Sequence, residues 1–113
     1  MTTIQITFRG MPEDRSVEAA IERWVERLEY VDADLRRCRV IVESEHRGPT
    51  PFRVRVALEP STGEVVIARD LPLRADVYVA VSDAFRVARR LLLSQLPAAT
   101  PRTAFAVCAS ART

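Results

Sequence analysis

The sequence predicts an α+β domain of order β-α-β-β-β-α, a four-stranded mixed sheet with two helices packed on one face. Three segments alternate apolar and polar residues, which is the period of a strand, and a fourth strand is expected after a turn. Two segments repeat apolar residues every three or four positions, which is the period of a helix. The chain has 113 residues, of which 48% are hydrophobic and 28% charged. That length and composition fit one globular domain with its own core.

The first strand and the first helix occupy the N-terminal third of the chain. A strand is expected over residues 4–9, where Ile4, Ile6 and Phe8 alternate with polar neighbours. A helix follows with Ser16 as its expected N-cap, because apolar residues then recur at helical spacing: Val17, Ala20, Ile21, Trp24, Leu28 and Val31. Its exposed face is acidic, with two arginines among four glutamates: Arg23, Arg27, Glu18, Glu22, Glu26 and Glu29.

Three further strands are expected in the middle of the chain. Residues 36–45 place Cys38, Val40 and Val42 on one face, and residues 52–59 alternate in the same way. Residues 60–63 (Pro-Ser-Thr-Gly) have the composition of a turn, and the next strand is expected over residues 64–69. Residues 70–75 contain Pro72 and are interpreted as a connector.

The second helix is expected to begin after Asp76, which is a suitable N-cap, and to end at Leu96, because Pro97 follows. Its apolar stripe has helical spacing: Val77, Val81, Ala84, Phe85, Ala88 and Leu92. Residues 97–113 are rich in Ala, Thr and Ser and show no sustained period. Residues 1–96 are therefore expected to form the domain, and residues 97–113 a flexible C-terminal tail.

The connections determine the strand directions. A helix between the first two strands makes them parallel, with a right-handed crossover, and the short connections that follow make the next strands antiparallel. The apolar stripes of both helices must then cover the same side of the sheet. The opposite sheet face would carry five arginines: Arg9, Arg37, Arg39, Arg53 and Arg55.

The charge is unevenly distributed, although the net charge is only +2. Residues 1–35 carry four arginines and eight acidic residues, residues 36–70 carry seven and five, and residues 71–113 carry six and two. The chain therefore changes from acidic to basic along its length, and such an asymmetry indicates an interaction with a charged partner. All 17 basic residues are arginine, a bias that a GC-rich genome would also produce.

An enzyme is not expected. The single histidine, His46, lies in a loop, and no Ser, Cys or Asp stands at a spacing that would make it part of a catalytic pair. The three glycines are not clustered, which excludes a phosphate-binding loop or a dinucleotide fingerprint. Cys38 points inward in its strand and is interpreted as a core residue. Cys38 and Cys108 are too few and too far apart for a disulfide framework or a zinc site. We expect no metal, no cofactor and no small-molecule substrate.

No segment reaches the roughly 18–20 apolar residues that cross a bilayer. The N-terminus lacks a basic region followed by an apolar one, so no secretory signal is expected. The cytoplasm is therefore the expected location, without membrane association.

Arginine placement is the remaining functional signal. Arg86, Arg89 and Arg90 form a basic ridge opposite the apolar stripe of the second helix, with only Asp83 nearby. A solvated face and phosphate binding are both open interpretations, since each guanidinium matches phosphate oxygens. The sheet-face arginines alternate with Glu43 and Glu59, which favours cross-strand ion pairs and leaves that face as a secondary basic surface.

Several segments, taken in order, resemble the ribosome hibernation-promoting factor family, also known as the protein Y or sigma-54 modulation family. They are residues 6–9 with Met11, residues 38–47, residues 63–66 and residues 76–90. The most specific is residues 76–81 (Asp-Val-Tyr-Val-Ala-Val), which is similar to the family's Asp-x-Tyr-x-Ala-Ile stretch before its basic helix. The resemblance covers about residues 4–96.

The resemblance implies a stress or hibernation factor that binds the 16S rRNA of the small ribosomal subunit near the decoding centre and silences translation. The residues that would then hold RNA phosphates are Arg86, Arg89 and Arg90, with help from Arg74. Such binding would read shape and phosphates and would be sensitive to salt. The alternative is a diverged protein-interaction module of the same fold, monomeric or homodimeric, that does not bind ribosomes.

Overall fold

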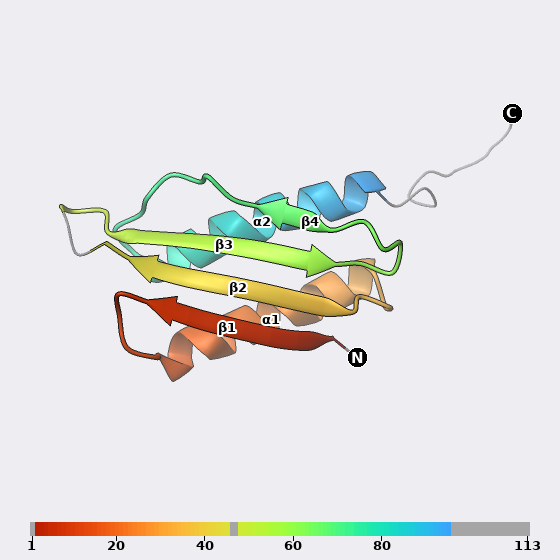
Figure 1. Cartoon of the computed structure of the whole chain (residues 1–113), viewed down its shortest axis with the longest axis horizontal. Helices are drawn as coiled ribbons and strands as arrows, with labels where there is room; N and C mark the ends of the chain where they lie inside the picture. Colours follow the sequence, from red (N-terminus) through yellow and green to blue (C-terminus); the bar gives the residue numbers. More distant parts are fainter. Residues whose placement is uncertain (1, 46–47, 96–113) are drawn as a thin grey trace, which may run out of the picture.

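The computed structural model describes residues 2–45 and 48–95, and it confirms the predicted order of strands and helices (Figure 1). His46, the predicted helix end at Leu96 and the predicted tail at residues 97–113 lie outside the described residues. The elements are β1 (Thr3–Arg9), α1 (Arg15–Val31), β2 (Arg37–Ser44), β3 (Phe52–Glu59), β4 (Val66–Ala68) and α2 (Val77–Gln95).

The sheet has the strand order β1-β2-β3-β4. β1 pairs with β2 in parallel, and β2–β3 and β3–β4 are antiparallel, as the connection lengths predict. Both helices lie on the same side of the sheet and run in the same direction (Figure 1). The other sheet face is not covered by any element in the described part of the chain.

The core fills the space between the sheet and the two helices. Each strand turns alternate residues inward, and each helix contributes its apolar stripe. The largest fully buried side chains come from both helices, from the sheet and from the connection between α1 and β2: Phe85, Ile21, Leu28, Leu35, Leu58 and Leu92. Burying one such side chain contributes about 1.5–3 kcal/mol relative to exposure, so this layer is the main source of stability.

Helix α1 begins two residues earlier than Ser16 would allow, so the predicted cap is wrong. The N-cap is Asp14, whose Oδ1 accepts hydrogen bonds from the backbone N–H groups of Ser16 (2.9 Å) and Val17 (3.3 Å). The apolar pattern begins only at Val17, and therefore it does not reveal the first turn. Asp14 has extended backbone angles and its carboxylate also suits the positive end of the helix.

Strand β4 is shorter than the predicted 64–69 segment, and only Val66–Ala68 pair with β3. The preceding turn is confirmed: the Gly63 N–H donates to the Pro60 carbonyl oxygen at 3.0 Å, and the φ of Gly63 is 88°, which favours glycine. The predicted connector at residues 70–75 contains one extra feature. Arg74 and Phe52 exchange two backbone hydrogen bonds of 2.8 and 3.0 Å at the start of β3.

A buried carboxylate joins the end of α1 to the β3–β4 turn. Asp32 is 6% exposed, and its two oxygens accept hydrogen bonds from the backbone N–H groups of Ser61 (2.8 Å) and Asp34 (3.1 Å). Hydrogen bonds to a charged group are stronger than neutral ones, and losing the acceptor leaves a donor without a partner.

We therefore expect Asp32→Ala to lower the free energy of unfolding by about 2 kcal/mol in urea denaturation. Asp32→Asn keeps an acceptor oxygen in the same place and should lose less. A loss of only a few tenths of a kcal/mol in Asp32→Ala would show that this link does not hold the turn.

In the described part of the chain, neither helix is long and apolar enough to cross a membrane.

Candidate nucleic-acid interface

An open groove runs between the two helices on the side of the domain away from the sheet. It is lined by residues of both helices, including three arginines and two aromatic residues: Ala20, Arg23, Trp24 and Arg27 of α1, and Tyr78, Val81, Ser82 and Arg86 of α2. Arg23, Arg27 and Arg86 therefore approach one surface from opposite walls. No carboxylate lines this groove within residues 2–45 and 48–95.

The helical period explains why α1, which is acidic as a whole, presents arginines to this groove. Ala20, Arg23, Trp24 and Arg27 follow i, i+3, i+4, i+7 spacing and share one side of the helix. The glutamates have the same kind of spacing on a different side: Glu18, Glu22, Glu26 and Glu29. The prediction that Arg23 and Arg27 lie among the four glutamates on one acidic face therefore needs correction, because the positive and negative charges of α1 lie on different sides of the helix.

Aromatic rings connect the groove to the core. Trp24 stacks on the buried Phe85 with ring centroids 5.8 Å apart and an angle of 11° between the planes. The guanidinium carbon of Arg27 lies 4.8 Å from the centroid of Trp24, a cation–π contact. Trp24 is only half-buried, so it supports the groove and also contributes to the core. These contacts restrict Arg27 at the groove surface.

The four predicted RNA-binding arginines take different positions. Arg86 lines the groove, and Arg89 and Arg90 are exposed on the same side of α2 one turn farther along. Arg74 instead forms an ion pair of 2.6 Å with Asp83. Because Asp83 is taken by Arg74, none of the three α2 arginines has an ion-pair partner among the described residues.

Sequence reasoning did not identify Arg23, Arg27, Tyr78 and Ser82 as site residues. The spacing of Arg23 and Arg27 around Trp24 was a usable signal, because a side chain four residues from another lies on the same helix face. The position of α2 beside that face was not visible in the sequence, and only this packing joins Arg23 and Arg27 of α1 with Arg86 of α2 in one surface.

The uncovered face of the sheet carries the second set of arginines, and cross-strand ion pairing is confirmed for three of them. Arg37 lies 3.8 Å from Glu59. Arg55 lies 2.9 Å from Glu43, and Arg53 lies 3.9 Å from Glu45. Of the other two, Arg39 donates to Gln5 at 3.4 Å, and Arg9 is exposed at the end of β1.

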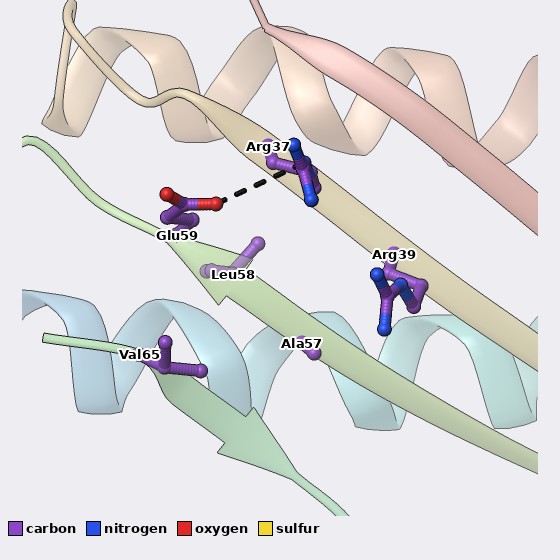
Figure 2. A pocket seen from close by; sticks show the side chains of 6 residues that line it. All are labelled: Arg37, Arg39, Ala57, Leu58, Glu59 and Val65. Atoms are coloured by element: carbon purple, nitrogen blue, oxygen red, sulfur yellow. Dashed lines mark ion pairs between the residues drawn. The ribbon is translucent and has the colours of Figure 1, made fainter. Parts of the chain in front are cut away.

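A shallow pocket on this face lies over the end of β3. In Figure 2 Arg37 turns toward Glu59, and Arg39 lies beside it on the same strand, above Ala57. Val65 forms the other side of the pocket. Two of the three charged groups in this pocket neutralise each other, so this face is a weaker anion site than the groove.

The Arg55–Glu43 pair makes the sheet sensitive to pH. The hydrogen bond from Arg55 is the largest influence and lowers the pKa of Glu43 below its ordinary value. Burial acts in the opposite direction, and the charges of Arg55, Arg9 and Arg53 each lower the pKa by a smaller amount. A carboxyl with a lowered pKa in the folded state stabilises the fold above its unfolded pKa of about 4.3, and this contribution is lost as the pH falls through the folded value.

We therefore expect the free energy of unfolding to fall as the pH drops below about 5, and Glu43→Gln to show a shallower fall over that range. Urea denaturation at a series of pH values measures both curves. Parallel curves for the two proteins would show that Glu43 does not contribute.

Other chemically reactive groups take structural positions. Cys38 is fully buried, and burial raises the pKa of its thiol to about 12, so it stays protonated and unreactive at neutral pH. The predicted role as a core residue is confirmed. No group of three or more acidic, histidine or cysteine side chains that could hold a metal ion occurs within the described ranges.

The fold and the groove together define a class: a small α+β domain with two helices on one sheet face and an arginine-lined surface between them. The sequence matches the family described as sigma 54 modulation protein / S30EA ribosomal protein over residues 4–95, so the chain belongs to this family of ribosome-associated factors, which is not a family of enzymes. The resemblance found in the sequence is thereby confirmed.

Solved structures share the fold. A ribosomal subunit interface protein from Coxiella burnetii has a TM-score of 0.68 and 16% identity, covering 83% of this chain and 96% of that one. The N-terminal domain of Protein Y from Thermus thermophilus has a TM-score of 0.62 and 17% identity, covering 81% of this chain and 96% of that one. No curated protein sequence matches the chain.

Proposed function

We propose that the protein binds 16S rRNA of the small ribosomal subunit near the decoding centre and silences idle ribosomes in the cytoplasm during stress. The observation that carries this proposal is the groove, where Arg23, Arg27 and Arg86 converge and no carboxylate of the described residues joins them. Membership of a ribosome-associated family supports the choice of ribosomal RNA as the ligand.

Arginine suits this role physically. Its planar guanidinium donates two parallel hydrogen bonds to phosphate oxygens and remains charged at any physiological pH. Arg89 and Arg90 extend the positive surface beyond the groove along α2. We place Arg74 at the edge of this surface, where it is oriented by Asp83. The open sheet face is a secondary RNA-binding surface, because its arginines would have to leave their ion pairs with glutamates before they could bind phosphate.

Co-sedimentation of the purified protein with small subunits and with whole ribosomes tests the proposal. Binding at low salt that weakens steeply as salt rises is expected, because each phosphate contact releases counterions. Absence of the protein from the ribosomal pellets at low salt would contradict the proposal.

The alternative function, a homodimeric protein-interaction module, is favoured by a different observation. Two apolar side chains, Val65 and Ile67, are exposed at the β4 edge of the uncovered sheet face. Burying them in a second copy would be favourable. Sedimentation equilibrium over a range of concentrations discriminates, since a concentration-dependent dimer without affinity for RNA would support this alternative.

A further inference from the structure

We infer that the groove binds an unpaired nucleotide, with the base stacked on Tyr78 and the flanking phosphates held by Arg23, Arg27 and Arg86. This inference rests on the proposed function and deepens it, because it specifies single-stranded or splayed-out RNA as the form of the ligand. The observation behind it is an exposed aromatic ring in the same groove as three arginines that have no carboxylate partner in the part of the chain that the structure describes.

Tyr78 is suited to stacking. Tyr78 is 45% exposed and lies in the first turn of α2. Its backbone N–H donates a hydrogen bond to the Asp76 Oδ1 at 2.8 Å. That bond fixes the start of the helix and hence the position from which the ring projects. Tyr78, Ser82 and Arg86 follow one another at four-residue steps along the same side of α2.

The groove therefore has an aromatic end and a positive end. Arg86 lies two helical turns beyond Tyr78, and Arg27 is held against Trp24 on the opposite wall. A guanidinium binds phosphate, and a tyrosine ring stacks on any base because every base has a π-face. The Ser82 hydroxyl between them can donate to or accept from a base edge or a 2′-hydroxyl.

This arrangement discriminates between RNA forms. In a duplex the bases stack on each other, and the surface of the duplex presents mainly phosphates and 2′-hydroxyls. Tyr78 would therefore meet no base face. An unpaired nucleotide presents its base face and its phosphates at once.

The single tryptophan of the chain, Trp24, lines the groove, so its fluorescence reports directly on RNA binding there. Titration with a short oligouridylate should quench its fluorescence, with tighter binding than to a fully paired RNA duplex of equal phosphate number. Tyr78→Leu should weaken oligouridylate binding about 5- to 100-fold, as loss of a stacking ring does, and leave duplex binding unchanged. Tyr78→Phe should retain the affinity.

The only other tyrosine, Tyr30, provides the matched control, because it is 92% exposed and lies against Glu26 and Glu29 outside the groove. Tyr30→Leu should bind both probes like the parent. Equal effects of Tyr78→Leu on both probes, or no effect on either, would overturn the inference, as would a loss in Tyr78→Phe as large as in Tyr78→Leu.

Failure of the inference is distinguishable from failure of the proposed function. If Tyr78→Leu binds oligouridylate like the parent while the parent still sediments with ribosomes, only the stacking role is overturned. If the parent does not sediment with ribosomes at all, the proposed function fails whatever the result with oligouridylate.

Discussion

Arg27→Glu combined with Arg86→Glu is expected to release the protein from the small ribosomal subunit. The two side chains line the inter-helix groove from different helices, so each reversal would replace a proposed phosphate contact with a repulsive charge. We expect the affinity at low salt to fall on the order of 100-fold, measured by co-sedimentation or by filter binding to small subunits. Both residues are exposed, so the fold should be retained.

The control changes the net charge by the same amount elsewhere. Arg39→Glu with Arg69→Glu places the two reversals on the open sheet face, where both side chains are exposed. This variant should lose only the modest affinity that follows from lower overall charge. If it releases the subunit while the groove variant stays bound, the sheet is the RNA-binding surface and the groove is not.

Phe85→Ala is expected to lower the free energy of unfolding by about 3–5 kcal/mol, because it opens a cavity where a fully buried ring now packs. The ring also supports Trp24, so its loss removes the stacked pair from beneath the groove. Such a cost is a large fraction of the roughly 5–15 kcal/mol that stabilises a typical domain. Urea denaturation followed by Trp24 fluorescence measures it.

Phe85→Leu refills most of the volume and should cost about 1 kcal/mol. Phe85→Leu also separates the contribution of core packing to stability from that of ring stacking, since it removes the ring partner of Trp24 but leaves the core nearly filled. A cost below about 1 kcal/mol for Phe85→Ala would mean that α2 is not anchored through this residue.

The fold was largely predictable because hydrophobic period and connection length act locally. The alternation around Val40 and Val54 predicts strands, and a helix between β1 and β2 requires a parallel pair. The ends of elements were less predictable. Asp14 and Ser16 are both good N-caps, and the apolar pattern, which begins only at Val17, does not distinguish between them.

The candidate site was only partly predictable, because it is made by packing between two helices. The basic character of Arg86, Arg89 and Arg90 is visible in the sequence, since Asp83 is the one nearby acid. The contribution of α1 is hidden by its four glutamates, and averaging charge over the helix gives the wrong sign for the side that faces α2. The sequence also does not show that Arg74 takes Asp83 as its partner.

Site-specific photo-crosslinking tests the location of RNA binding most directly. A photo-reactive amino acid replaces Ser82 in the groove in one variant and the exposed Thr7 on the open sheet face in another, and each is irradiated with small subunits. We expect 16S rRNA to be captured from position 82 and not from position 7. Capture from position 7 alone, or from neither position while the protein remains bound, would contradict the assignment of the groove as the RNA-binding surface.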